Sequence, residues 1–275
     1  MGASQETTHA YNAPRHPGPQ DRFEPRVGST MIEPLLLTAA HVSTFAGQQL
    51  LSNASGFYFE REGRLYVVTS RHVVFDEASG HFPDRIELEL HIDPGNIAAS
   101  TGFSIPLYRN GQGVWRQGGD RSGNIDVAVI ELVRPALPES MVYQAFTPEH
   151  LPKPEDVEVG ASLLVVGFPL GFHDRLHHLP VVRHAVIASS YGLRFQGEGY
   201  FLTDARTHRG TSGAPVVMRP PKGGGPGGAL AWLVVGVHSS RLDVGTRDLG
   251  ADEALGLNSA WYSDILLTLT SPAGG

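Results

Sequence analysis

The chain contains no cysteine, which excludes disulfide bonds and zinc sites built from thiolates. Disulfides form and persist in oxidising compartments, so their exclusion favours a reducing one and we expect a cytoplasmic location. Positive charge is also scarce, because 21 Lys and Arg stand against 28 Asp and Glu and give a net charge of −7. This balance argues against a nucleic-acid-binding surface, so nucleic acid is not an expected partner.

Long hydrophobic runs are missing as well. No stretch approaches the roughly 20 apolar residues needed to span a bilayer, so a membrane is not an expected partner. Residues 1–29 are polar and rich in Pro, Gly, His and Arg, without the apolar centre of a signal peptide. We expect this segment to be a disordered N-terminal tail, with a propeptide or a docking arm as the alternatives.

Glycine and proline, in contrast, are abundant, with 33 Gly and 20 Pro among 275 residues. They separate short strand-like runs by turn signals, which predicts an all-β barrel or sandwich rather than a parallel α/β sheet. The glycine-rich segment 223–228 predicts a flexible connection between two of the later strands. The strand-like runs cover residues 65–69, 85–92, 126–132, 162–167, 181–189, 199–203, 215–218 and 230–237.

Residues 210–215, Gly-Thr-Ser-Gly-Ala-Pro, place Ser212 between glycines in a predicted tight turn. A serine hydroxyl becomes a strong nucleophile only when a neighbouring base takes its proton. Attack on a carbonyl also needs backbone N–H groups directed at the oxyanion that forms. Flanking glycines allow the positive φ angles that such a turn requires. Taken alone, the motif is moderately specific, since glycine-serine turns also occur in ordinary loops.

Two further segments, one with a histidine and one with an aspartate, precede this turn. His72 lies in Val-Val-Thr-Ser-Arg-His-Val-Val at residues 67–74, and Asp126 lies in Asn-Ile-Asp-Val-Ala-Val at residues 124–129. With these contexts the chain resembles the chymotrypsin-like serine protease family over roughly residues 30–270. It is most similar to the cysteine-free bacterial trypsin-like, HtrA-like and glutamyl endopeptidase members.

This resemblance implies two six-stranded antiparallel β-barrels followed by a C-terminal helix. The first barrel would span residues 30–150 and carry His72 and Asp126, and the second would span residues 151–275 and carry Ser212. The apolar spacing of Ser259, Trp261, Ile265 and Leu269 predicts the helix at the end of the second barrel.

The resemblance also implies the role of each residue in a serine endopeptidase. His72 would be the general base and later the general acid, Asp126 would orient its imidazole, and Ser212 would attack the carbonyl. The N–H groups of Gly210 and Ser212 would form the oxyanion hole, and the hydroxyl of Ser239 would contact the aspartate. No cofactor and no metal is implied. The expected partner is a protein or peptide substrate, and the expected state is a monomer or weak oligomer.

His41 competes with His72 for the role of base, because residues 37–42, Leu-Thr-Ala-Ala-His-Val, spell the family's histidine motif more closely. The family's histidine follows a hairpin. Residues 55–59 and 65–68, joined by Glu-Gly-Arg at residues 62–64, predict that hairpin before His72. Nothing comparable precedes His41. We therefore assign the base to His72 and interpret His41 as a structural histidine in the first barrel.

The residues of the expected specificity pocket leave two interpretations open. Thr207 and His238 occupy the positions at which glutamyl endopeptidases of this family bind an acidic side chain, and Arg241 lies in a segment that borders this pocket. Charge-assisted hydrogen bonds from such groups would favour Glu or Asp before the scissile bond. A small apolar preference is the competing interpretation.

Other features leave different classes of function open. His173, His177 and His178 with Asp174 have spacing that would suit a metal site on a helix, but the prolines around them favour a loop. Thr211 stands where digestive relatives have an aspartate that pairs with a freed N-terminus, so activation by cleavage is not expected. The alternative to an active protease is a catalytically silent pseudoprotease that binds peptides.

Overall fold

The computed structural model describes residues 32–121, 123–221, 226, 228, 230–241 and 256–272. The predicted N-terminal tail, residues 1–29, lies outside the described residues, as does most of the glycine-rich connection at 223–228. The segment from Glu33 onward forms one compact unit made mostly of strands. None of the described helices is long and apolar enough to cross a membrane.

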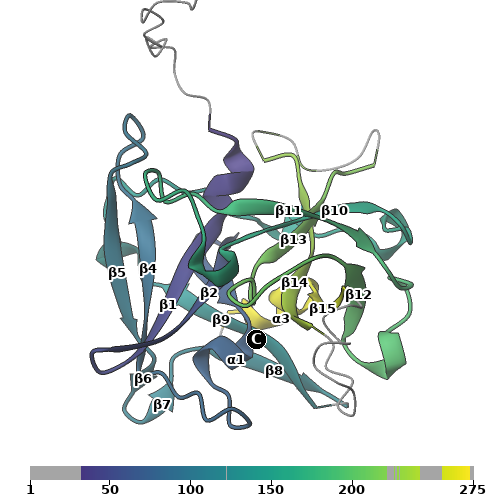
Figure 1. The fold of residues 1–275 in the computed structure, drawn as a ribbon, viewed down its shortest axis with the longest axis horizontal. Coiled ribbons are helices and arrows are strands. Elements are labelled where there is room, and N and C mark those ends of the chain that lie inside the picture. Colours follow the sequence, from purple (N-terminus) through teal and green to yellow (C-terminus); the bar gives the residue numbers. More distant parts are fainter. Residues whose placement is uncertain are drawn as a thin grey trace, which may run out of the picture. The chain divides into compact units, whose positions relative to one another are not determined.

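The first half of the chain forms a seven-stranded antiparallel sheet with the strand order β5-β4-β1-β2-β3-β9-β8 (Figure 1). Polar and apolar residues alternate along β4, so one face of this strand is buried and the other is partly exposed. A small hairpin of β6 and β7 follows β5. The strands are β1 (Ala39–Ala46), β2 (Gln49–Arg61), β3 (Arg64–Thr69), β4 (Arg85–His91), β5 (Ser100–Pro106), β6 (Tyr108–Arg109), β7 (Gln112–Gly113), β8 (Arg116–Asp120) and β9 (Gly123–Leu132).

The second half forms a closed six-stranded barrel with the order β10-β11-β12-β15-β14-β13. Closure leaves no free strand edge in this barrel, which explains why its short, apolar strands are stable. Its strands are β10 (Ser162–Gly167), β11 (Val181–Ile187), β12 (Tyr200–Asp204), β13 (Pro215–Met218), β14 (Leu233–Arg241) and β15 (Leu257–Tyr262).

The helical elements are short. Three single 3-10 turns, each containing a proline, connect the two sheets between Leu132 and Ser162. The helical elements are η1 (Pro34–Thr38), α1 (Arg71–Val74), η2 (Arg134–Ala136), η3 (Pro148–His150), η4 (Pro154–Asp156), η5 (Pro169–Gly171), η6 (Phe195–Gly197) and α3 (Ile265–Leu269).

The all-β prediction is confirmed, with three differences in detail. The described strands of the first half form a sheet that is not closed, whereas a barrel was expected there. This sheet has seven strands rather than six, because the glycine-containing β8 pairs with β9 although it lacks an apolar alternation. The C-terminal helix begins at Ile265, and Ser259 and Trp261 lie instead in β15. Pairing of β15 with both β12 and β14 closes the barrel, and this tertiary pairing overrides the helical spacing of the sequence.

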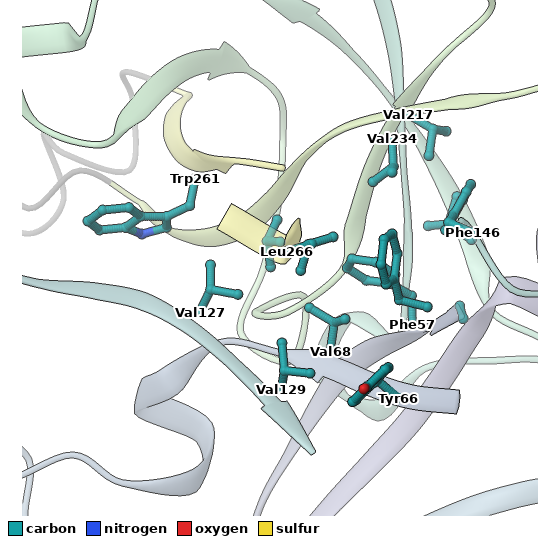
Figure 2. Close-up of a cluster of buried hydrophobic side chains, with 14 of the residues drawn as sticks. Phe57, Tyr66, Val68, Val127, Val129, Phe146, Val217, Val234, Trp261 and Leu266 are labelled. Atoms are coloured by element: carbon teal, nitrogen blue, oxygen red, sulfur yellow. The ribbon is translucent and has the colours of Figure 1, made fainter. Parts of the chain in front are cut away.

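A continuous hydrophobic cluster joins the two sheets (Figure 2). Phe57 and Val127 extend into it from the first sheet, and Val217 and Val234 enter from the barrel. Leu266 of α3 is fully buried in the same cluster. The cluster fixes the two sheets against each other, which positions any residues located where the sheets meet.

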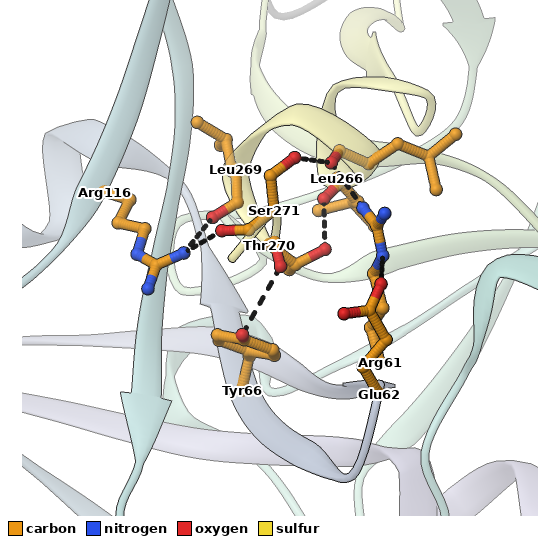
Figure 3. A network of polar contacts seen from close by, with 9 residues as sticks. Arg61, Glu62, Tyr66, Arg116, Leu266, Leu269, Thr270 and Ser271 are labelled. Atoms are coloured by element: carbon orange, nitrogen blue, oxygen red, sulfur yellow. Dashed lines mark hydrogen bonds and ion pairs between the residues drawn. The ribbon is translucent and has the colours of Figure 1, made fainter. Parts of the chain in front are cut away.

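The C-terminal helix is also held by polar contacts from the first sheet (Figure 3). The last carbonyls of a helix lack partners within the helix, so they accept bonds from elsewhere. A guanidinium nitrogen of Arg116 donates to the Ser271 carbonyl at 2.7 Å, and the Tyr66 hydroxyl donates to the Thr270 carbonyl at 3.4 Å. Arg61 donates to the carbonyl of Leu267 at 2.6 Å.

Candidate active site

His72 lies on α1, a single helical turn that begins directly after the buried strand β3. Asp126 lies on β9, which pairs with β3 so that Thr69 is opposite Ala128. The imidazole Nδ1 of His72 is 2.7 Å from Oδ2 of Asp126. The backbone N–H of His72 donates to the other carboxylate oxygen at 2.8 Å. The carboxylate therefore fixes both the ring and the backbone of the histidine.

The charge of this pair follows from burial and hydrogen bonding. Burial disfavours the imidazolium, but the hydrogen bond and the negative charge of Asp126 outweigh it and raise the pKa of His72 above its ordinary value. The hydroxyl of Ser239, on β14, donates to Oδ2 of Asp126. This is the contact that the family resemblance implied, and it helps to fix the orientation of the carboxylate.

Ser212 lies in the turn before β13, with Gly210 at φ +89° and Gly213 at φ +84°. A Cβ atom on Gly213 would lie 2.2 Å from the carbonyl oxygen of Ser55, so only glycine fits there. The Ser212 hydroxyl donates to the carbonyl of Ser239 at 2.9 Å. Ser212 and His72 line the same cavity, but no hydrogen bond joins these two described residues.

The N–H groups proposed for the oxyanion hole are those of Gly210 and Ser212. Within the described part of the chain, neither of them donates a hydrogen bond to a protein acceptor. The Gly210 carbonyl is bonded instead to the Ser55 hydroxyl at 2.7 Å. Two neighbouring N–H groups without an internal acceptor are able to bind a developing oxyanion.

The cavity beside Ser212 has a volume of about 410 Å³. Sequence reasoning did not identify the residues on its walls that come from β2 and from the loop after α1. Their only signal in the sequence is their proximity to His72 and to the predicted hairpin. The cavity is lined by residues 51–54, His72, Val73, Asp76, Ser79, Gly80, His81, Arg209, Gly210 and Ser212.

The predicted specificity residues are found in two environments. Thr207 is buried, and its hydroxyl donates to Oδ1 of Asn258 at 2.5 Å. His238 is 2% exposed, and burial together with the charge of His72 lowers its pKa to about 4. Its Nδ1 has no hydrogen-bond partner among the described residues. The side chain of Arg241 lies outside the described residues. Asn258, which sequence reasoning missed, comes from β15.

His41 lies on β1 opposite Ser55, and it does not line the cavity that holds Ser212. Its ring packs against Phe168 and His173, with centroid distances of 4.9 Å and 5.3 Å. Burial, reinforced by His173, lowers the pKa of His41 to about 4. His41 is therefore a half-buried histidine packed between aromatic rings, away from Ser212.

The segment with several histidines between η5 and β11 forms turns and no helix, as its prolines predicted. An isolated bridge pairs Asp174 with Leu179, and His177 Nδ1 lies 2.7 Å from a carboxylate oxygen of Asp174. Among the residues that the structure describes, no group of three or more His, Asp or Glu side chains is arranged to hold a metal ion.

Solved structures similar to this chain include a serine endoprotease from Yersinia pestis. The identity is 16% and the TM-score is 0.49, and the match covers 85% of this chain and 61% of that chain. An inactive mutant of Rv3671c from M. tuberculosis matches with 16% identity and a TM-score of 0.46 over 86% of this chain and 89% of that chain. This chain thus spans less than two thirds of the Yersinia structure.

A comparison with curated proteins found no match. The model of the trypsin-like peptidase domain family, however, matches residues 54–220, which is more than half of the 275 residues. This range includes His72, Asp126 and Ser212. The chain belongs to the trypsin-like peptidase domain family.

Proposed function

We propose that the protein is a serine endopeptidase in which Ser212, His72 and Asp126 form the catalytic triad. The observation that carries the proposal is the pairing of Asp126 with His72, whose ring lines the cavity that also holds Ser212. The proposal includes the division of the chain into residues 30–150, which would carry His72 and Asp126 on the first sheet, and residues 151–275, which would carry Ser212 on the barrel. The substrate is a protein or peptide.

In the proposed mechanism the Ser212 hydroxyl turns from the Ser239 carbonyl to His72 and gives its proton to the imidazole. Its oxygen then attacks the scissile carbonyl, and the N–H groups of Gly210 and Ser212 bind the oxyanion. The imidazolium, stabilised by Asp126, protonates the leaving amine and leaves an acyl group on Ser212. A water molecule, deprotonated by His72, hydrolyses this acyl-enzyme and restores the serine.

A fluorophosphonate probe, which labels activated serines, tests the proposal. We expect it to label the wild-type protein, to fail with Ser212→Ala, and to label His72→Ala much more slowly. His41→Ala is the matched control and should be labelled at the wild-type rate. Loss of labelling in a folded His41→Ala variant would reassign the base. Absence of labelling in the folded wild-type protein would contradict the proposed activity.

We further propose a preference for Glu or Asp before the scissile bond. The buried, uncharged imidazole of His238 supports it, because a neutral ring with its proton on one nitrogen can donate one hydrogen bond to a carboxylate. Thr207 contributes less directly, since its hydroxyl proton is already donated to Asn258. Hydrolysis rates on matched peptides with Glu, Ala or Arg at that position test the preference, and faster cleavage after Ala would favour a small apolar pocket.

The alternative function is a catalytically silent peptide-binding module. One observation favours it, namely the donation of the Ser212 hydroxyl to Ser239 rather than to His72. A folded wild-type protein that binds substrate peptides, hydrolyses none of them and takes up no fluorophosphonate would support this alternative.

A further inference from the structure

Ser55 is a fully buried serine on β2 that contacts the nucleophile turn from the opposite sheet. Its hydroxyl donates to the carbonyl oxygen of Gly210 at 2.7 Å and accepts from the backbone N–H of Phe168 at 2.9 Å. Its own backbone N–H donates to the carbonyl of Ser212 at 2.9 Å. A single residue of the first sheet therefore bonds to both residues whose N–H groups are proposed for the oxyanion hole.

These contacts bear on the direction of the Gly210 N–H. The preceding carbonyl, that of Arg209, accepts from the N–H of Leu170 at 2.6 Å, and the Gly210 carbonyl accepts from Ser55. The N–H of Gly210 belongs to the same peptide unit as the Arg209 carbonyl, so it points the opposite way. With the carbonyl on each side held, the Gly210 N–H cannot change its direction unless one of these bonds breaks.

The surrounding packing leaves little room for an alternative arrangement. A Cβ atom on Gly210 would lie 2.6 Å from the Phe168 carbonyl oxygen, and one on Gly167 would lie 2.6 Å from the Ser55 hydroxyl. Leu170 itself has a φ of +54°, a conformation that non-glycine residues adopt at an energetic cost. The side-chain hydrogen bonds to Gly210 and Phe168 come from the Ser55 hydroxyl, and the Thr69 hydroxyl in turn donates to the Ser55 carbonyl at 2.8 Å.

We propose that Ser55 is a positioning residue of the active site: its hydroxyl, bonded to Gly210 and Phe168, holds the nucleophile turn with its N–H groups directed at the oxyanion. This inference rests on the proposed function. Ser55 does not touch the reacting atoms and acts through Gly210. Its loss should therefore cost less than the roughly 10²- to 10³-fold in kcat expected for removal of an oxyanion-hole donor.

The test compares wild type, Ser55→Ala and Thr38→Val on one peptide substrate. Thr38 is a matched control because it is equally buried and its hydroxyl also donates to a backbone carbonyl, that of Leu35 at 2.7 Å. Two inhibitors with the substrate's sequence are added. A peptide aldehyde forms a tetrahedral adduct with an oxyanion, whereas the peptide ending in a primary alcohol does not.

We expect Ser55→Ala to lower kcat and the aldehyde affinity together by about 10- to 100-fold, as partial loss of an oxyanion donor would. KM and the affinity for the alcohol should remain within about twofold of wild type, as expected when only binding to the transition state is lost. Thr38→Val should change none of these. Ser55→Cys keeps a weak donor of similar size, so it should show a smaller loss in the same two quantities, and it serves as the test if Ser55→Ala does not fold.

A folded Ser55→Ala or Ser55→Cys protein with wild-type kcat and aldehyde affinity would overturn the positioning role. A fall in aldehyde and alcohol affinities by the same factor would also overturn it, since that result indicates general distortion of the site. Both results are obtained with an active wild type, so they leave the proposed function standing. Hydrolysis by Ser212→Ala at the wild-type rate would instead overturn the proposed function and this inference with it.

Discussion

At the scale of single residues, the proposed role of His72 ties the pH range of the proposed activity to its ionisation. Asp126 raises the pKa of His72 above its ordinary value despite partial burial. Only a neutral imidazole can accept the serine proton, so the proposed activity should be lost as the pH falls through this raised pKa. The raised pKa affects the stability of the fold in the opposite direction. The contribution of His72 to the free energy of unfolding is fully present below about pH 6.5, and it is lost as the pH rises through the raised pKa.

The first prediction is a pH profile. We expect kcat/KM to rise with pH with a midpoint above about 6.5, the ordinary value for histidine. Asp126→Asn removes the negative charge but not the burial, so the midpoint should move to lower pH and kcat should fall by roughly 10⁴-fold, as for other triads. Steady-state rates between pH 5 and pH 9 measure both quantities. An unchanged midpoint in Asp126→Asn would show that the carboxylate does not set the ionisation of His72.

The second prediction concerns the backbone conformation of Gly213. Its φ of +84° is unfavourable for other residues, and an added Cβ would lie 2.3 Å from the Thr69 hydroxyl oxygen as well as against Ser55. Gly213→Ala should lower the free energy of unfolding by about 3 kcal/mol or more, through backbone strain and overpacking. Gly102→Ala on β5, where no atom lies within 4 Å of the added Cβ, is the control and should be close to neutral. Denaturant unfolding of the two variants makes the comparison.

At the scale of elements, α3 is too short to be stable by itself. Helices of five residues form only when packing supports them, and in α3 this support comes from the buried side of the helix. Leu266→Ala should cost about 2–5 kcal/mol, because the side chain is fully buried in the cluster between the sheets. Leu267→Ala changes the next residue, which is 40% exposed, and should cost well under 1 kcal/mol. Equal losses from both variants would mean that the cluster does not hold the helix.

The elements also show how far the sequence predicts the fold. The runs at 162–167 and 215–218 coincide with β10 and β13, because apolar side chains and flanking turn residues mark both ends. The strands β1, β5 and β8 were not predicted as such, since small and polar residues obscure their alternation. The sequence predicts that the C-terminal helix begins near Ser259 rather than at Ile265, for a related reason. The strand β15 is set by its pairing partners rather than by its own sequence.

The candidate active site shows the same limit on what the sequence can predict. His72, Asp126 and Ser212 stand in recognisable local sequences, so sequence alone was sufficient to propose them. Ser55 was seen only as part of a hairpin, because its contact with Gly210 joins residues 155 positions apart. The hydrogen bond of Thr207 to Asn258 was missed in the same way, since it spans 51 positions. Residues that act through a contact across the fold leave no signature in their own segment.

At the scale of the whole molecule, several histidines are buried in an uncharged state. Burial lowers the pKa of His91 and His150, and it lowers the pKa of His41 and His238 to about 4. In the unfolded chain these imidazoles take up protons near pH 6.5, whereas in the folded protein they do so only at lower pH. Between the folded and unfolded pKa values the unfolded state binds more protons than the folded state. The stability that these histidines contribute is therefore present above about pH 6.5 and is lost as the pH falls.

The last prediction follows from this difference. Lowering the pH from 7 to 5 should reduce the free energy of unfolding. A histidine whose folded pKa is near 4, such as His41, should account for about 2 kcal/mol of this reduction. His41→Leu removes that contribution, so the difference in stability between pH 7 and pH 5 should shrink in this variant. Urea unfolding at both pH values measures the effect as a difference within each variant, so any packing change caused by the leucine cancels. An equal pH dependence in wild type and His41→Leu would mean that His41 protonates as readily in the folded protein as in the unfolded chain.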